Sequence, residues 1–367
     1  MKALCIGGAM IDTIAIIESD RIERMSMLNA EMSFLLLEEG RKTEAIEVST
    51  HCGGGAVNTA VAMARLGLDV ATLVILGRDA RADLILGRLT AEGISARWVI
   101  RDGNAPTGAS VLISSHDRNA AVFTFRGANT LLEPRDLNDE AFVADLVYVS
   151  GLSNRSAECY PAIIDKAKAA GALVAVNAGV RQLSARGGAF LDSLGKVDIL
   201  AINRPEADSL VPALVGKFGE GGSALALDTG EEPPPLLARG LIGGGYEMSL
   251  PAFLCALRRL GTRYVMLTDG RGGAFVCVDG GVVYCPAVEA TVAGTAGAGD
   301  AMAATFAAFI ALGRPVDVAL KAATLNAASV VAHIDTQSGL LRRDALEGRL
   351  SARSELRLRK WKLEPAM

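Results

Sequence analysis

The chain has 367 residues, a formal net charge of −4, 50% hydrophobic and 5% aromatic residues, and 40 glycines. A weakly acidic chain lacks the basic surface that nucleic acids require, and no run of about 18 apolar residues predicts a membrane span. Three histidines and six cysteines without a C-x-x-C pair argue against zinc and indicate a reduced, cytoplasmic protein.

The first part of the chain is predicted to contain two glycine turns, each preceded by a strand. A buried strand at residues 4–9 leads to the first turn, and Asp12 lies just past it. Residues 14–48 space their apolar side chains unevenly and alternate in part, which predicts a small excursion of strands rather than a core helix. The second turn, at residues 52–58, opens a helix expected at residues 59–66, which Gly67 ends.

From there on, strand and helix patterns alternate. Strands are predicted at residues 70–76, 110–114, 121–125, 146–149, 173–176, 199–202, 264–267, 282–285 and 288–292, and helices at 82–92, 161–170, 252–260, 301–312 and 319–333. The segments at 110–114 and 121–125 form a hairpin pattern. Such alternation predicts an α/β fold with a parallel sheet between two layers of helices.

Two further segments interrupt this pattern. Residues 216–248 are rich in glycine and contain three consecutive prolines, so a loop insertion is expected there. Residues 342–362 are strongly basic and roughly helical in pattern, and a solvated helix face is the expectation for them.

The most informative motif is T-A-G-A-G-D at residues 295–300, which joins predicted strands to the helix at 301–312. Small residues at such a junction let a ligand approach the backbone, and the first N–H groups of the helix then attract an anion such as phosphate. A carboxylate at Asp300 would repel phosphate, but it could take the proton from a hydroxyl that attacks the phosphate. A helix cap after a glycine turn is the structural alternative.

Four other motifs occur together with this one. The set is G-G-G-A-V-N at residues 53–58, R-G-A-N at 126–129, N-R-P-E at 203–206, T-D-G-R-G-G at 268–273 and G-A-G-D at 297–300. Each motif alone is common, but five in this order and spacing make the chain resemble the ribokinase family, also called the PfkB carbohydrate kinases, over residues 4–341.

The resemblance implies a three-layer α/β/α fold with a mostly parallel central sheet at residues 1–341. It also implies a small β-lid built from segments at about 13–50 and 104–127, which agrees with the excursion and the hairpin found from the pattern. Residues 342–367 fall outside it as a basic C-terminal tail. The implied activity is transfer of the γ-phosphate of ATP, with Mg²⁺, to a small molecule that carries a hydroxymethyl group.

The resemblance also assigns catalytic roles. Asp300 would be the general base, and the N–H groups of Gly297, Ala298 and Gly299 would stabilise charge on the transferring phosphoryl group.

On the nucleotide side, Thr268, Gly270 and Gly273 would line the nucleotide. Asn203 would contribute there and, with Glu206, organise Mg²⁺ through water, since Mg²⁺ keeps several waters and needs few carboxylates.

On the acceptor side, Asp12 would hold substrate hydroxyls, and Gly54, Gly55 and Asn58 would complete the site. His51, beside the glycine turn, is a further candidate for contact with the substrate.

Several of these assignments have plain structural alternatives. Asn203 and Glu206 match a helix capping box, and Asp12 could be an ordinary turn residue. Asn326 lies in the predicted helix at 319–333, where a family residue approaches the adenine and ribose, but an Asn on the surface fits the pattern equally well.

The chain departs from the family pattern at three points. Gly294 stands where the motif usually begins with an Asp that helps to hold K⁺, so activation by K⁺ is in doubt. The usual D-P-N-x-R is N-A-G-V-R at residues 177–181, where only Arg181 remains. Gly55 replaces a Lys seen in many ribokinases. These changes remove charge and weaken the case for a plain sugar substrate.

The acceptor is inferred from the apolar residues of the predicted lid, Met25, Met27, Leu28, Met32 and Phe34. A nucleoside base needs apolar contact surface, and methionine adapts well to a flat ring. This favours the adenosine kinase branch of the family. The alternative is that these residues pack the lid against itself or against a second lid in a homodimer.

Three other functions compete with a nucleoside kinase. A sugar kinase acting on ribose, fructose or a related polyol is the main one. A catalytically silent binding protein of the same fold would gain nothing from Asp300 at a phosphate hole. A Rossmann dehydrogenase would need G-x-G-x-x-G after the first strand, where the chain has G-G-A-M-I-D at residues 7–12.

Overall fold

The computed structural model describes residues 1–18, 23–26, 33–36, 40, 42–115, 120–220, 232–353 and 356–363, with the backbone alone at 23–26, 33–36, 115 and 120. Its centre is a nine-stranded sheet of order β19-β18-β17-β16-β13-β12-β11-β1-β6. The strands are β1 (Lys2–Ile6), β6 (Asp69–Leu73), β11 (Leu146–Val149), β12 (Leu173–Val176), β13 (Ile199–Asn203), β16 (Tyr264–Thr268), β17 (Ala274–Val278), β18 (Gly281–Cys285) and β19 (Arg359–Lys362). Strands from β6 to β16 run parallel, and β17 to β19 extend the sheet as an antiparallel edge.

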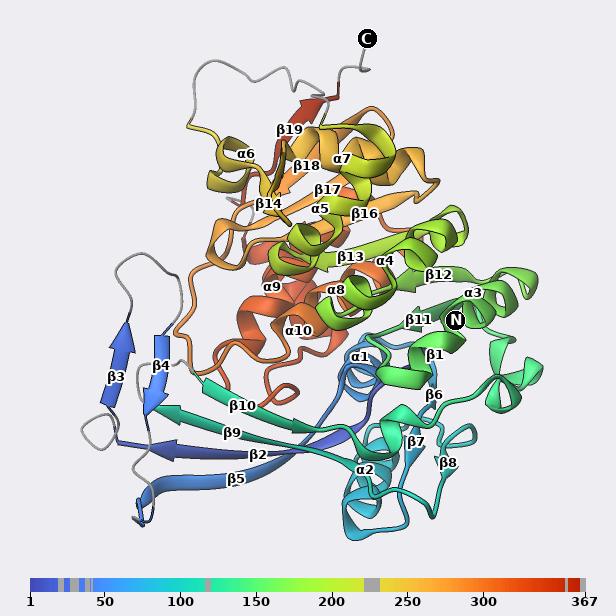
Figure 1. Ribbon diagram of the computed structural model, residues 1–367, viewed down its shortest axis with the longest axis vertical. Helices are drawn as coiled ribbons and strands as arrows, with labels where there is room; N and C mark the ends of the chain where they lie inside the picture. The colour runs from blue at the N-terminus through green and yellow to red at the C-terminus, as the bar shows by residue number, and fades with distance from the viewer. Residues whose placement is uncertain are drawn as a thin grey trace.

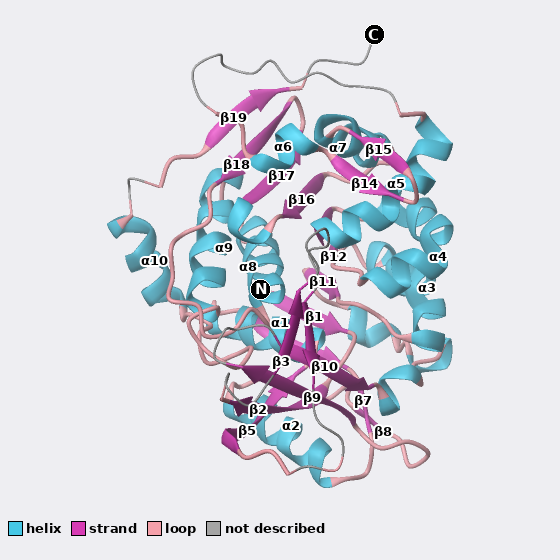
Figure 2. Cartoon of the chain, turned by 60° about the vertical axis from the view of Figure 1, so that its left-hand side comes forward, coloured by secondary structure: helices cyan, strands magenta, loops and turns pink. Residues whose placement is uncertain are grey.

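Helices cover both faces of this sheet, which confirms the predicted three-layer fold (Figure 2). The principal helices are α1 (Gly55–Arg65), α3 (Tyr160–Ala169), α4 (Val180–Ser193), α5 (Arg204–Phe218), α7 (Leu250–Arg259), α8 (Ala298–Ala311), α9 (Val316–Val330) and α10 (Arg343–Ala352). Successive side chains of a strand point to opposite faces of the sheet, so the buried side chains of each strand divide between the two helix layers. In β1, Leu4 and Ile6 join the core under α3, α4, α5 and α7, whereas Ala3 and Cys5 join the core under α1, α8 and α9.

A second, four-stranded sheet projects from the carboxyl ends of the central strands (Figure 1). Its order is β10-β9-β2-β5, with β2 (Met10–Ile17), β5 (Ala45–Gly53), β9 (Gly108–Ser115) and β10 (Ala120–Phe125). Helix α2 (Ala80–Ala91) lies beside it, the short strands β7 (Ile75–Leu76) and β8 (Ile100–Arg101) pair nearby, and β3 (Glu23–Ser26) with β4 (Ser33–Leu36) forms a separate hairpin. We call the four-stranded sheet the lid sheet.

Several predicted helix boundaries were wrong, and the observed boundaries change the position of the candidate site residues within their helices. Helices α1 and α8 begin at Gly55 and Ala298 rather than at residues 59 and 301, because each helix starts as soon as the chain leaves a glycine with positive φ. Asn58 and Asp300 therefore lie inside first helical turns. Asp12 lies within β2 of the lid sheet.

Other differences concern segments at the edges of the pattern. Residues 288–292 form no strand, and the predicted strand at 70–76 is divided at Val74. The expected loop at 216–248 contains the end of α5, then α6 (Pro235–Arg239) and the hairpin β14 (Leu241–Gly243) with β15 (Tyr246–Met248). The basic tail supplies α10 and β19, and Trp361 is buried against the sheet, so the tail is more than a solvated helix.

Candidate active site

Asp300 is placed by the start of α8. Gly297, the residue before the helix, has φ 79°, and a Cβ there would lie 2.7 Å from the Thr336 Cβ, so only glycine fits. The first N–H groups of the helix, at residues 298–300, have no intrahelical acceptor and carry partial positive charge. The carboxylate of Asp300 thus lies at the edge of a backbone anion hole.

Asn58, in the first turn of α1, holds the Asp300 carboxylate. Its Nδ2 donates to Asp300 Oδ2 over 2.8 Å. Its Oδ1 accepts from Thr336 Oγ1 over 2.8 Å and from Gln337 Nε2 over 3.0 Å. Two donors on Oδ1 orient the amide so that its N–H faces Asp300. Thr336 and Gln337 were not predicted, because no sequence motif marks them.

The surroundings of Asp300 suit a general base. Burial raises the pKa of its carboxyl from 3.8 to about 6, the bond from Asn58 lowers it, and the charge of Asp12 raises it. A base with a pKa just below neutral pH is ionised when it works and still has appreciable proton affinity.

Asp12 faces the same region from β2 of the lid sheet. It lies in register with His51 of β5 and Ser110 of β9, and the Ser110 hydroxyl donates to its Oδ1. Burial raises the pKa of Asp12, while the bond from Ser110 and the charge of His51 lower it. The other oxygen, Oδ2, would collide with a Cβ at Gly53, so that glycine makes room for the carboxylate.

The second glycine turn brings α1 against the central sheet. Gly54 has φ 93°, and a Cβ there would lie 2.5 Å from the Gly8 carbonyl oxygen. A Cβ at Gly55 would lie 2.7 Å from the Ser150 Cβ and 3.6 Å from Asp300 Oδ1. Ser150 follows β11 and was not predicted. The two glycine turns, the end of β11 and the start of α8 therefore meet at Asp300.

The predicted nucleotide side begins at the ends of β13 and β16, where Asn203 and Thr268 are in register. Asn203 caps α5: its Oδ1 accepts from the Glu206 N–H and its own N–H donates to Glu206 Oε2, both over 2.9 Å. The capping-box alternative is thus present in the structure, and it also fixes the Glu206 carboxylate.

Glu206 is a buried carboxylate at the start of α5. Burial raises its pKa to about 7; the bonds from Asn203 oppose this, and the charge of Asp300 adds to it. A carboxyl whose pKa is raised by burial and by a neighbouring carboxylate gains from any positive charge that comes close to it. Within the described residues, no group of three or more His, Cys, Asp or Glu forms a metal cluster.

Thr268, Gly270 and Gly273 form a tight turn after β16. The Asp269 N–H donates to the Gly273 carbonyl over 2.9 Å, and Gly273 has φ 85° with no room for a Cβ beside the Cys285 carbonyl. Asn326, by contrast, is fully buried. Its amide donates to Thr305 Oγ1 over 2.8 Å and accepts from the Leu341 N–H over 2.9 Å, so it links α8, α9 and the chain after them.

The remaining predicted residues lie around this centre. His51 Nε2 lies 2.9 Å from Ser49 Oγ on the Asp12 face of the lid sheet. A Cβ at Gly294 would lie 3.2 Å from the His333 and Ile334 carbonyl oxygens. Met32 lies outside the described residues, and of Phe34 the structure describes only the backbone, in β4.

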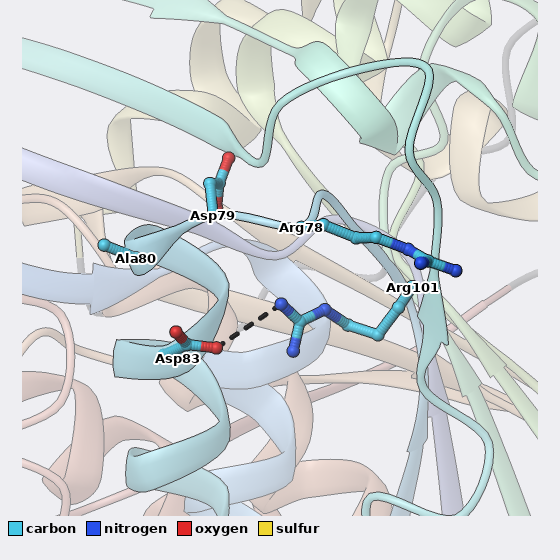
Figure 3. A pocket seen from close by; sticks show the side chains of 5 residues that line it. All are labelled: Arg78, Asp79, Ala80, Asp83 and Arg101. Carbon is cyan, nitrogen blue, oxygen red and sulfur yellow. Dashed lines mark ion pairs between the residues drawn. The ribbon is translucent and has the colours of Figure 1, made fainter.

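A cavity of about 520 Å³ lies apart from these residues, at the start of α2 (Figure 3). Arg78, Asp79, Ala80, Asp83 and Arg101 line it. Asp83 pairs with Arg101 over 3.3 Å, and Asp79 caps α2 and accepts from Thr107. Because these charges serve the fold, we assign no ligand to this cavity.

No helix within the described ranges is long and apolar enough to cross a membrane.

The chain is similar to known proteins over most of its length. The family described as pfkB family carbohydrate kinase matches residues 2–220 and 252–343. Deoxyribokinase of Salmonella typhimurium is 26% identical over 331 residues, which cover 89% of this chain and 94% of the relative. Ribokinase of Arabidopsis thaliana, solved with ribose and ATP, is similar with TM-score 0.68 and 20% identity, covering 95% of this chain and 98% of that one. Burkholderia thailandensis nucleoside kinase, solved with inosine, gives TM-score 0.67 and 19% identity, covering 97% and 100%.

Proposed function

The chain belongs to the pfkB family of carbohydrate kinases, and from this premise we propose that it transfers the γ-phosphate of ATP to a primary hydroxyl of a sugar or nucleoside, with Asp300 as general base. One observation carries the assignment of the base. Asp300 lies in the first turn of α8, where burial raises the pKa of its carboxyl to about 6 and Asn58 donates a hydrogen bond to it.

In this proposal the acceptor hydroxyl lies between Asp300 and Asp12. Asp12 accepts hydrogen bonds from neighbouring hydroxyls and so orients the acceptor, and Asp300 takes the proton of the attacking hydroxyl. Asn58 keeps one oxygen of Asp300 engaged, which leaves the other directed to the substrate. The N–H groups at the start of α8 stabilise the charge on the transferring group.

The nucleotide is proposed to lie toward Asn203, Thr268 and the turn at Gly270 and Gly273. Mg²⁺, held through water at Glu206, would neutralise phosphate charge when bound. The protein's own part is to hold the Glu206 carboxylate, which the capping bonds with Asn203 already do.

The test is ADP release from ATP with a panel of ribose, deoxyribose, fructose and adenosine. Asp12→Ala should raise KM for the accepted compound, because hydroxyls of the bound acceptor lose their partner in a closed site. Unchanged KM for every acceptor would remove Asp12 from the site.

A nucleoside acceptor, adenosine first, is the second candidate. The hairpin β3–β4 favours it, because it adds a segment beyond the lid sheet and pairs Met25 with Phe34 in register. Phe34→Ala should then raise KM for adenosine, since stacking on a base is worth about 1–3 kcal/mol. Turnover of ribose or fructose far above that of adenosine would reject this candidate.

The lid sheet also supports a homodimer. Strand register places Val48, Val111, Phe123 and Phe125 on the face opposite Asp12, with exposed fractions between 43% and 64%. A second copy of the chain would cover this apolar face. Sedimentation should show a dimer that Phe123→Ser weakens, and a monomer at micromolar concentration would contradict the proposal.

A further inference from the structure

Two parts of the chain lie outside the family match, residues 221–251 and residues 344–367. We call the first the insertion; its described residues include α6 and the hairpin of β14 and β15, and the second part includes β19. The two parts lie at the same end of the molecule (Figure 2). They are also bonded, because Arg359 Nη1 in β19 donates to the Glu232 carbonyl of the insertion over 2.8 Å.

Both parts reach the turn after β16, residues 268–273, which we call the nucleotide turn. Two backbone bonds close this turn, from the Asp269 N–H to the Gly273 carbonyl over 2.9 Å and from the Gly272 N–H to the Asp269 carbonyl over 2.8 Å. Three of its six residues are glycines, which lose much conformational freedom when the turn is fixed. Contacts from outside the turn therefore help to hold it in one conformation.

Strand β19 reaches the nucleotide turn through Trp361, which is buried. The Trp361 ring lies 6.1 Å from the ring of Tyr284 in β18, measured between centroids. Tyr284 in turn packs against the end of the nucleotide turn, where a Cβ at Gly273 would lie 2.8 Å from Tyr284 Cε2 and 3.0 Å from its hydroxyl oxygen. The last residue of the turn thus rests on a ring that Trp361 supports from behind.

The insertion reaches the same turn through Arg239, at the end of α6. Its Nη2 lies 3.9 Å from Asp269 Oδ1, and the Nε of Arg204 at the start of α5 lies 3.9 Å from the same oxygen. Only 12% of the Asp269 side chain is exposed. A carboxylate in a turn that binds a nucleotide would repel the phosphates, because like charges raise each other's energy. Two guanidinium groups at this carboxylate offset that repulsion.

We infer that the insertion and β19 form one support for the nucleotide turn, in which Trp361 and Arg239 are positioning residues that set the affinity for the phosphoryl donor. This inference rests on the proposed function, which places ATP at this turn. Trp361 acts through Tyr284, and Arg239 acts through Asp269. The acceptor side is built from α1, α8 and the lid sheet, so its affinity should not depend on either residue.

The first experiment measures binding of ADP with Mg²⁺ by titration calorimetry, without an acceptor. Trp361→Ala should raise the Kd for ADP at least about ten-fold, because loss of a buried ring leaves a cavity into which Tyr284 can move. Trp361→Phe keeps a ring there and should stay within about three-fold of the wild type. Phe190→Ala is the matched control: it removes a buried ring of α4 that packs on Tyr160, and it should leave the Kd unchanged.

A second variant decides the matter if Trp361→Ala does not fold. Arg239→Gln changes a side chain that is 40% exposed, so the fold should tolerate it. It should raise the Kd for ADP at least about three-fold at low ionic strength and by less in high salt, because salt screens the repulsion by Asp269. Arg186→Gln loses an ion pair with Glu158 at a similar exposure, 34%, and should leave the Kd unchanged.

Steady-state kinetics by ADP release separate the two substrates. Trp361→Ala and Arg239→Gln should raise KM for ATP and keep KM for the accepted compound within about two-fold of the wild type. An equal rise in both KM values would overturn the inference, because it would indicate a general loosening of the fold. Unchanged ADP affinity in Arg239→Gln and in folded Trp361→Ala would also overturn it, while the kinase assignment would stand. Failure of the wild-type protein to bind ADP would contradict the proposed nucleotide site and the inference with it.

Discussion

Replacement of Asp300 by Asn should remove activity and at the same time stabilise the fold. The carboxylate is held at a pKa of about 6 instead of 3.8. A folded-state pKa above the unfolded value means that the folded protein binds the proton more tightly. The wild-type protein therefore loses stability as the pH rises from about 4 to about 6, and the loss is complete above that window.

The size of the effect follows from the shift. About two units correspond to about 3 kcal/mol at pH 8, which is an upper bound because an Asn side chain also needs hydrogen-bond partners. Asn58 Nδ2 can donate to the new amide oxygen as it does to Asp300 Oδ2 over 2.8 Å, so this contact survives. We expect Asp300→Asn to raise the free energy of unfolding by about 1–3 kcal/mol at pH 8 and by much less at pH 4.5.

The assays are urea unfolding at pH 4.5 and pH 8, and ADP release. kcat should fall by about 10² to 10⁴, the range for loss of a general base. Asp83→Asn is the matched control, because Asp83 lies on α2 with its side chain 71% exposed. It should leave kcat unchanged, and loss of its ion pair with Arg101 should cost less than about 1 kcal/mol at both pH values. Activity within a few-fold of wild type would reject Asp300 as base. Equal stability changes at both pH values would refute the raised pKa of Asp300.

Three further predictions follow from the same residues. Asn58→Ala removes a bond that lowers the pKa of Asp300, so the acidic limb of the pH–rate profile should move up by about one unit; a limb at the same pH would contradict this. Gly297→Ala forces a Cβ to within 2.7 Å of another side chain in left-handed backbone and should lower kcat at least about ten-fold, whereas Gly87→Ala, with nothing within 4 Å, should not. With Gly294 in place of a carboxylate, exchange of K⁺ for a bulky organic cation at constant ionic strength should change the rate less than about two-fold, and strong activation would show that carbonyl oxygens alone build the site.

The fold was predictable because its signals are local. The strands predicted at 146–149 and 173–176 coincide with β11 and β12, since short apolar runs between turns have few alternatives in an α/β chain. Strand β17 was missed, and residues 288–292 were wrongly given strand character, because apolar runs near a sheet edge acquire their structure from pairing partners.

The tail shows the same limit more clearly. Its charges indicate a solvated helix, yet Trp361 of β19 is buried against β18. Residues 359–362 form a strand because they pair with β18, the strand that would otherwise be the edge of the central sheet. Which strand lies at that edge depends on the order of all the strands, and the tail sequence does not contain this information.

The sequence by itself determined the family, the glycine turns and Asp300, because a glycine with positive φ before a helix and an acid in the first turn are local, motif-sized features. Only the tertiary structure determined which residues surround the glycine turns and Asp300. Asn58, Thr336 and Ser150 lie far apart in the chain and meet at Asp300 only when α1, α8 and the central sheet pack together. Burial and the approach of distant charges set the pKa of a carboxyl, and neither is a property of neighbouring residues in sequence.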